Sequence, residues 1–382
     1  MWENVFIILI ILLALAYSFL ILYYKKWFQQ LKEFHLADYT NASITFSIII
    51  PARNEALNIA NCLQSIINQN YPKELFEVIV INDHSTDNTS EIVQQFQHQF
   101  SNIKLIELQH VLQGRVINAY KKRAIENAIQ QATGKWIITT DADCFVQPNW
   151  LKLYNDFIIE KDVVFVAAPV MFKNHNSILS NFQFIDFMAL QITTAAAVAA
   201  GFHSMCNGAN LAYNKNVYFE VDGFKGIDKI ASGDDMLLMN KIKKLYPKRI
   251  GYLFSKEAIV LTEAMPSWKQ FFNQRIRWAS KSDQYSDATL LPALLLVYLF
   301  NLLTISCFFI GLFKLKFLLL FLLLFSCKIL VEWLFIKSAF NFFGRVNLIK
   351  FILLQTIHIV YIIIAGWLGK FGTYTWKERG VK

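Results

Sequence analysis

Four long apolar runs constrain this chain more than any other feature of its sequence. The first covers residues 5–24, and three more lie beyond Asp287, at 290–313, 315–336 and 348–368. A helix of about 20 apolar residues is long enough to cross the roughly 30 Å hydrocarbon core of a bilayer. Such runs explain why only 17% of the 382 residues are charged, against about 25% in ordinary globular chains. We therefore expect one N-terminal and about three C-terminal transmembrane helices.

The first run is expected to be an uncleaved anchor. It is followed by Lys25 and Lys26, whereas a signal peptide carries its positive charge before the apolar run and a cleavage site after it. The positive-inside rule places the lysine end, and the domain that follows it, in the cytoplasm. The alternative, a buried core helix, is disfavoured by the length of the run.

The C-terminal runs carry charges of their own. Lys337, Arg345 and Lys350 predict a cytoplasmic connection before the last run, but the basic tail would then lie on the opposite side, so the orientation of the last helix stays open. Lys328 and Glu332, inside the second of these runs, have the i,i+4 spacing of a helical ion pair. An internally paired charge is favoured over a transport pathway.

A further apolar stretch, at 182–202, differs from these four runs. It contains Gln183, Asp186 and Gln191, and many of its apolar residues are alanine. Ionisable residues are costly inside a bilayer. This stretch therefore predicts a helix of a soluble domain rather than a membrane span.

Charge and cysteine content limit the class of protein further. With 37 Lys and Arg against 28 Asp and Glu, the net charge is +9, which fits nucleic acid, an anionic membrane surface or an anionic small substrate. The soluble part has no basic stripe with interleaved aromatic residues, which argues against nucleic acid. The five cysteines form no CxxC pair, so neither a disulfide framework nor a zinc site is expected.

The middle of the chain, from about 44 to 262, alternates short β-branched runs with helical segments. The expected strands are 46–50, 76–81, 103–108 and 136–140, and helical stretches such as 56–70 and 89–99 lie between them. This alternation predicts an α/β fold with a mostly parallel sheet. Ligands of such sheets bind beyond the carboxyl ends of the strands, and polar residues cluster there in this sequence.

Three polar segments follow strands directly. Residues 51–55 come after the first strand and 82–87 after the second; their carboxylates could accept hydrogen bonds from a nucleoside, or Asp83 or Asp87 could simply cap the next helix. Asp141 and Asp143 follow the strand at 136–140. Such a pair could share a hard divalent cation with phosphate oxygens and water, although the DxD pattern also occurs in ordinary turns.

Two more clusters lie further along. Residues 232–235, Ser-Gly-Asp-Asp, precede an amphipathic segment; the paired carboxylates could supply a general base or could cap that helix. A helical segment at 266–282 carries Gln274, Arg277 and Trp278, which share one face while Arg275 points elsewhere. An interfacial membrane helix would explain this segment equally well.

Together, in this order and at strand ends, these features resemble the family 2 glycosyltransferases. The resemblance is to the membrane-attached branch, which includes cellulose, hyaluronan and chitin synthases and the lipid-directed ceramide and carotenoid glucosyltransferases, and it covers about 45–282. It implies a nucleotide-sugar-binding domain of the Rossmann-like A type, an inverting mechanism, and Mg²⁺ or Mn²⁺ as cofactor.

The resemblance also implies residue roles. Asp235 would be the catalytic base, with Asp234 beside it where glutamate is common, and Asp141 and Asp143 would bind the metal. Lys122 looks like the basic residue of the family's GKxxAL stretch, with Lys121 in place of the usual glycine. Donor binding would fall to Pro51, Arg53, Glu55, Asp83, Lys122, Asp141, Asp143, Gln274, Arg277 and Trp278. The acceptor side would comprise Asn207, Gly208, Asn210, Asp234 and Trp278.

The predicted organisation is an N-terminal transmembrane anchor at 1–26, a catalytic domain at 44–262, an amphipathic interface segment at 263–288, a C-terminal transmembrane region at 289–370 and a basic tail at 371–382. The expected function is transfer of a sugar from a nucleotide-diphosphate sugar to a membrane lipid or lipid-linked acceptor. The alternatives are a processive polysaccharide synthase and, in a different class, a non-catalytic membrane scaffold or a nucleic-acid-binding membrane protein.

Overall fold

The computed structural model describes residues 2–36, 41–112, 119–173, 177–228, 230, 233–281, 287–372, 374–376 and 379–381. The chain divides into two compact units. The sheet unit comprises Lys32–Lys173 and Ser204–Glu263, and the helical unit comprises Met1–Leu31, Asn174–His203 and Ala264–Lys382.

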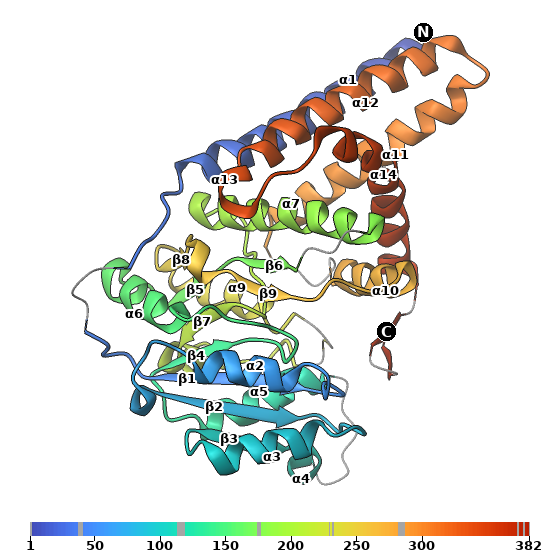
Figure 1. Ribbon diagram of the computed structural model, residues 1–382. Coiled ribbons are helices and arrows are strands. Elements are labelled where there is room, and N and C mark those ends of the chain that lie inside the picture. The colour runs from blue at the N-terminus through green and yellow to red at the C-terminus, as the bar shows by residue number, and fades with distance from the viewer. Residues whose placement is uncertain are drawn as a thin grey trace. The chain divides into compact units, whose positions relative to one another are not determined.

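A seven-stranded sheet forms the centre of the sheet unit, in the order β3-β2-β1-β4-β7-β5-β8 (Figure 1). Neighbouring strands from β3 to β4 run parallel, β7 is antiparallel to both its neighbours, and β5 and β8 are parallel. The predicted α/β fold with a mostly parallel sheet is confirmed. The strands are β1 (Phe46–Ala52), β2 (Phe76–Asn82), β3 (Ile103–Glu107), β4 (Trp136–Thr139), β5 (Phe165–Ala167), β7 (Leu211–Asn214) and β8 (Ile250–Tyr252).

Helices and a smaller sheet complete this unit. A parallel pair, β6 (Val170–Phe172) and β9 (Val260–Thr262), forms the second sheet. The helix at 89–99 begins and ends where the sequence predicts, whereas the helix predicted at 56–70 is shorter. The helices are α2 (Ile59–Ile67), α3 (Thr89–Gln99), α4 (Leu108–Leu112), α5 (Tyr120–Gln131), α6 (Trp150–Lys161), α8 (Lys215–Glu220) and α9 (Met236–Leu245), with 3₁₀ turns η1 (Lys73–Leu75) and η2 (Lys256–Ala258).

The strand register brings the polar residues together. Ala52, the last residue of β1, pairs with Asn82, the last residue of β2, and β4 runs parallel to β1 on its other side. The strand interiors are almost entirely buried, as expected for a parallel sheet covered on both faces. The chain emerges from these strands into polar loops, so the expected ligand-binding edge exists.

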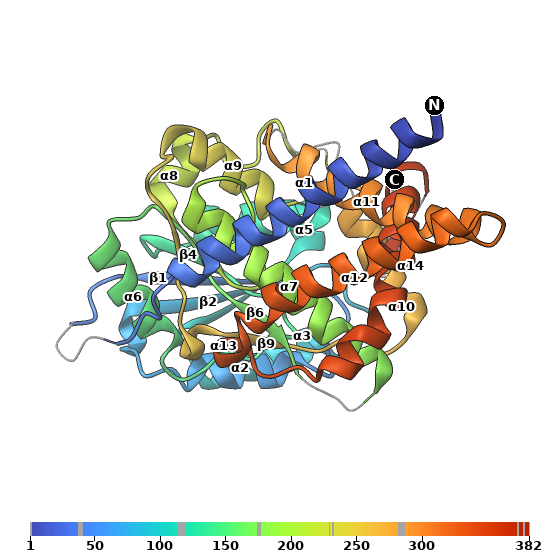
Figure 2. The same cartoon turned by 90° about the horizontal axis from the view of Figure 1, so that it is seen from above.

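The helical unit contains the apolar runs. Its elements are α1 (Trp2–Gln30), α7 (Ile178–Ala200), α10 (Trp268–Ala279), α11 (Leu290–Gly311), α12 (Leu315–Lys337), α13 (Phe340–Phe343) and α14 (Leu348–Phe371), followed by the hairpin β10 (Tyr374–Trp376) and β11 (Arg379–Val381). Helix α1 packs against α7, α11 and α12, and α14 packs against α10 and α11 (Figures 1 and 2).

Among the described residues of this unit, five helices are long and apolar enough to cross a membrane: α1, α7, α11, α12 and α14. Four of them are the predicted N-terminal and C-terminal helices. The fifth, α7, forms at the stretch predicted to be a soluble-domain helix, and two thirds of its most apolar window is buried against other elements. It groups with the terminal helices rather than with the sheet, so the compact units cut across the predicted 44–262 domain.

Several charged residues in the helical unit form ion pairs. Lys328 and Glu332 form the ion pair predicted from their spacing, and Glu332 also accepts a hydrogen bond from the Tyr17 hydroxyl. Glu3 pairs with Lys314 and Lys316. The latter contacts place the start of α1 beside the turn between α11 and α12.

Candidate active site

Arg53 joins the ends of β1 and β2. Its guanidinium donates to the backbone carbonyls of Asp83 and His84, at 2.9 and 3.1 Å. The Asp83 side chain is buried and lies 2.9 Å from Nδ1 of His84. Glu55 accepts from the Asn58 amide, and its own backbone N–H donates to Thr89. Pro51 lies within β1, opposite Ile81. Arg53, Glu55 and Asp83 are therefore brought to one edge of the sheet.

The capping alternative fits Asp87. Asp87 accepts from the backbone N–H groups of Ala56 and Thr89, at 3.0 and 3.1 Å, and so fixes the start of α3. The Asp83 carboxylate contacts the His84 ring. Asp83 stays a predicted nucleoside ligand.

The DxD turn follows β4. Asp141 is 39% exposed, Asp143 is half-buried, and Ala142 between them is buried. Two thiols lie beneath this turn: Cys62 contacts the Asp141 carbonyl and Cys144 contacts the Asp143 carboxylate, both at 3.7 Å. Burial first, and then the nearby aspartates, raise the pKa of both thiols above the usual value. Burial therefore disfavours the thiolate form of both cysteines.

Lys121 connects the DxD turn to the second acidic pair, Asp234 and Asp235. Its ammonium lies 2.8 Å from Oδ1 of Asp141 and 3.5 Å from Oδ2 of Asp234. Burial by itself would lower the pKa of Lys121, but the carboxylates of Asp141 and Asp234 outweigh that effect and raise the pKa above its ordinary value. Lys121 is therefore a permanent cation between carboxylates from two distant parts of the sequence.

Lys122, which the resemblance assigns to donor binding, does not point toward these carboxylates. It is 2% exposed, and its ammonium donates to the carbonyls of Ile227 and Ile230, at 2.7 and 2.8 Å. The lysine that reaches the carboxylates is thus Lys121. The sequence held a signal for this assignment, because Lys121 has the KxxA spacing of the family stretch with Ala124. Lys122 instead tethers the segment that leads to the second acidic pair.

Gly208 lies close to the side chains of Lys121, Asp234 and Asp235. A Cβ atom at that position would come within 3.4 Å of Asp234, 3.6 Å of Lys121 and 3.7 Å of Asp235. The Gly208 carbonyl accepts from Thr139 on β4, and its N–H donates to Oδ2 of Asp235 at 3.2 Å. Any side chain here would enter the space between the charged groups, so glycine leaves that space open.

Asp235 caps the start of α9, as one of the two interpretations of its sequence proposed, and it also contacts Gly208. Its Oδ1 accepts from the backbone N–H of Met236 at 2.7 Å, at the start of α9. Together with the bond from Gly208, this contact fixes the orientation of the carboxylate. The preceding Ser232 lies outside the described residues. We call Lys121, Asp141, Gly208, Asp234 and Asp235 the carboxylate cluster.

Asn210, which the resemblance places on the acceptor side, lies outside the carboxylate cluster. It is fully buried; its amide oxygen accepts from Trp150 and Tyr154, and its amide nitrogen donates to the carbonyls of Pro169 and Ala258. All its hydrogen-bonding capacity is used inside the core. Asn207 is half-buried and closes the turn, accepting from Ala209 at 3.0 Å.

Helix α10 carries the predicted Gln274, Arg277 and Trp278, all half-buried, within the helical unit. Arg275, which was expected to point away from these three residues, is buried and contacts two of them. Its guanidinium donates to Gln274 at 3.2 Å and lies 4.2 Å from the centre of the Trp278 ring. One buried arginine therefore touches two of the three predicted residues.

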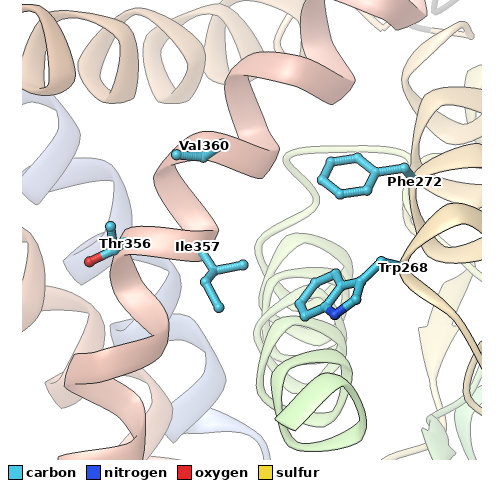
Figure 3. A pocket seen from close by; sticks show the side chains of 5 residues that line it. All are labelled: Trp268, Phe272, Thr356, Ile357 and Val360. Carbon is cyan, nitrogen blue, oxygen red and sulfur yellow. The ribbon is translucent and has the colours of Figure 1, made fainter.

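An apolar pocket of about 330 Å³ lies between α10 and α14. Trp268 and Phe272 line it from α10, facing Thr356, Ile357 and Val360 on α14 (Figure 3). Its volume is at the lower end of the range for ligand pockets. The lining suits an apolar group.

The donor set for a metal ion is small. Among the described residues, no group of three or more His, Cys, Asp and Glu side chains could hold a metal ion. Mg²⁺ needs no such group, because it is usually bound by one or two carboxylates together with substrate phosphates and water. Asp143 and Asp141 fit that arrangement, and Asp141 would exchange its contact with Lys121 for it.

The sequence matches two family descriptions. Residues 47–220 match "Glycosyl transferase family 2", and residues 136–367 match "Glycosyl transferase family group 2". The second match extends through the DxD turn, the second acidic pair, α10 and most of α14 and covers more than half of the chain.

Two curated relatives are similar over part of their length. The chain is 27% identical over 266 residues to the probable glycosyltransferase YdaM of Bacillus subtilis, covering 68% of this chain and 58% of that protein. It is 25% identical over 244 residues to poly-beta-1,6-N-acetyl-D-glucosamine synthase of Staphylococcus epidermidis, covering 61% of this chain and 53% of that protein. The chain thus spans little more than half the length of these relatives.

One solved structure resembles almost the whole chain. It is the mannosyltransferase PcManGT of Pyrobaculum calidifontis in complex with GDP-Man and Mn²⁺, with a TM-score of 0.59 and 18% sequence identity, covering 95% of this chain and 98% of that chain. At this identity the likeness concerns the fold, which includes the apolar helices as well as the sheet.

Proposed function

The chain belongs to the family 2 glycosyltransferases, and we propose that it moves a sugar, with inversion, from a nucleotide-diphosphate sugar to a hydroxyl group of a membrane lipid or lipid-linked acceptor. The observation that carries this proposal is the carboxylate cluster. It gathers Lys121, Asp141, Asp234 and Asp235 around the open position at Gly208.

Asp235 is the proposed general base. Its carboxylate takes the proton of the acceptor hydroxyl as that oxygen attacks the anomeric carbon, and the bond to the nucleoside diphosphate breaks on the opposite face. The hydrogen bonds from Met236 and Gly208 hold this carboxylate in one orientation. A fixed base needs little reorganisation during proton transfer.

Cations are proposed to stabilise the charge that develops on the leaving diphosphate. In the sheet unit Lys121 is the candidate, since its raised pKa keeps it charged. On α10, Arg277 is the candidate by its place in the sequence Gln274-x-x-Arg277-Trp278 that the family resemblance rests on. Asp143 and Asp141 would hold Mg²⁺ or Mn²⁺, which would neutralise part of the same charge. Arg53, Glu55 and Asp83 are proposed to hold the nucleoside.

A lipid acceptor is favoured by the helical unit. Five helices have membrane-spanning length and apolarity, and α10 lines an apolar pocket together with α14. We propose an integral membrane protein with its sheet unit in the cytoplasm, in accordance with Lys25 and Lys26 at the end of the first run. Trp278 would stack near the acceptor.

A processive polysaccharide synthase is the second candidate, because a relative carries that activity in its name. The two candidates differ in where the sugar accumulates. Membranes containing the chain would be incubated with a panel of radiolabelled nucleotide sugars, and the product separated into lipid-extractable and insoluble fractions. The proposal predicts label in the lipid extract. Label in insoluble polymer alone would favour the synthase, and no transfer from any donor would refute both.

A further inference from the structure

Arg275 is a buried arginine on α10 that forms an ion pair. Its side chain is 2% exposed, and its Nη2 donates to Oδ2 of Asp186 at 2.6 Å, where the Asp186 side chain is 4% exposed. Charged side chains are almost never so deeply buried unless they are paired. Since Asp186 lies on α7 and Arg275 on α10, this ion pair fastens α10 to α7.

The Asp186–Arg275 ion pair is linked to further polar side chains of the helical unit. Oδ1 of Asp186 lies 3.9 Å from Nε2 of His358 on α14, and Nδ1 of His358 lies 3.3 Å from the Lys328 ammonium on α12. Lys328 pairs with Glu332, which accepts from Tyr17 on α1. Five helices of the helical unit thus contribute to one polar network, and Arg275 is its end on α10.

The guanidinium of Arg275 is also held between two aromatic rings of its own helix. It lies 4.9 Å from the centre of the Phe271 ring and 4.2 Å from that of Trp278. Its second amino group donates to Gln274. A planar guanidinium can stack on an aromatic face while it donates in its own plane, which an ammonium cannot do. The orientation of Arg275 therefore fixes the Trp278 ring and the Gln274 amide.

We infer that Arg275, held by Asp186, is a positioning residue that sets the orientation of Trp278. The inference rests on the proposed function in one respect, since that proposal places Trp278 near the acceptor. That Arg275 orients Trp278 follows from contacts within the helical unit and does not depend on the proposed function. Phe187 also lies on α7, and the centre of its ring is 6.2 Å from the centre of the Trp278 ring. Phe187 therefore packs near Trp278 as well.

The test is Arg275→Lys in the full-length chain, solubilised in detergent. Lysine keeps the charge beside Asp186 but loses the stacked plane and the donor to Gln274. The protein would carry 5-fluorotryptophan, and the resonance of Trp278 would be assigned by its loss in Trp278→Phe. Arg275→Lys is expected to shift or broaden this ¹⁹F resonance. It is also expected to lower kcat about tenfold, on the scale of a desolvated cation–π contact, with the donor KM within about twofold of wild type.

The control removes the far end of the polar network. The double variant Lys328→Met, Glu332→Gln deletes a buried ion pair of the same unit that is separated from Arg275 by His358 and Asp186. It is expected to lower the melting temperature while leaving the Trp278 resonance and the kcat of the folded protein unchanged. This comparison separates positioning of Trp278 from a general loss of packing.

Two results would overturn the inference. One is an unchanged Trp278 resonance in Arg275→Lys, whatever the activity. The other is a changed resonance with wild-type kcat in a chain that transfers sugar. If the wild type transfers no sugar from any donor, the proposed function fails separately, and the ¹⁹F comparison still decides whether Arg275 orients Trp278.

Discussion

The two adjacent lysines of α5 allow a matched test of the carboxylate cluster. Lys121→Met removes an ammonium that lies 2.8 Å from Asp141 and 3.5 Å from Asp234. A hydrogen bond to a charged group contributes about 1.5–3 kcal/mol. Because the Asp141 side chain is 39% exposed, water competes for it, and the lower end of that range applies. We expect the free energy of unfolding to fall by about 1.5 kcal/mol and kcat/KM for the donor to fall about tenfold, because the leaving diphosphate loses the same cation.

Lys122→Met is the matched control. This lysine is 2% exposed, and its two hydrogen bonds hold the carbonyls of Ile227 and Ile230. Its loss should destabilise the sheet unit by about 1–3 kcal/mol and lower activity only in proportion to the fraction of folded protein. The ammonium would be replaced by an apolar group of similar length, so packing changes little.

The assay measures release of nucleoside diphosphate with the donor that the wild type accepts, and thermal denaturation of each detergent-solubilised variant. The assignment predicts that Lys121→Met is folded and slow, whereas Lys122→Met is unstable and, once folded, close to wild type. The reverse pattern would refute the placement of Lys121 in the site. Wild-type kcat/KM in Lys121→Met would refute its role as the cation of the cluster.

Three further outcomes follow from particular contacts. Asp143→Asn should raise the Mg²⁺ or Mn²⁺ concentration needed for half-maximal transfer, and chelation by EDTA should abolish transfer by the wild type until the metal is restored; metal-independent transfer would contradict the metal assignment. Burial acts to raise the pKa of Glu77, but hydrogen bonds from Lys104, Ser47 and Thr133 outweigh it and lower the pKa from 4.5 to about 2. At about 1.4 kcal/mol per unit this pairing contributes about 3 kcal/mol, which is present above pH 4.5 and is lost as the pH falls towards 2. Glu77→Gln should therefore lower the melting temperature at pH 7 and flatten its dependence on pH between 5 and 2, and equal melting temperatures at pH 7 would contradict this. Gly208→Val should abolish transfer while leaving the fold intact, since its side chain would enter the space between Lys121, Asp234 and Asp235; wild-type activity would place the reacting groups elsewhere.

The sequence was most informative where its pattern was regular. The first four strands lie within one or two residues of their predicted positions, because each is a β-branched run that ends in polar residues. The strands β5, β6, β8 and β9 have three residues each, too few to show a period of two, and they were not predicted. The four terminal apolar helices were found from length alone.

Residue assignments were harder to predict than elements. Lys121 and Lys122 both lie one turn before the buried face of α5 formed by Ala124, Ile125 and Ala128, so helical spacing does not separate them, whereas the KxxA spacing of Lys121 with Ala124 does. Asn210 stands in a loop pattern typical of a binding site, yet four partners from separate segments bury it completely. Such long-range hydrogen bonds leave no local signal in a sequence.

Helix α7 shows the same limit on a larger scale. Its polar residues argued against a membrane span, and in the structure they are satisfied by other parts of the helical unit: Gln183 bonds the backbone of Met265 in both directions, and Asp186 pairs with Arg275. Whether a polar residue disfavours a bilayer depends on partners that only the fold supplies.

Asp235→Asn tests most directly whether Asp235 is the base of a sugar transfer. Asparagine caps a helix about as well as aspartate, so α9 should keep its start, but the amide cannot accept the acceptor proton. The measurement compares transfer and donor binding in this variant, in wild type and in a variant of an exposed aspartate near the cluster in sequence, Asp228→Asn. We expect Asp235→Asn to bind the donor as wild type does and to lose about 10²–10⁴ in transfer rate, while Asp228→Asn is unaffected. Normal turnover by Asp235→Asn would contradict the assignment of Asp235 as the base.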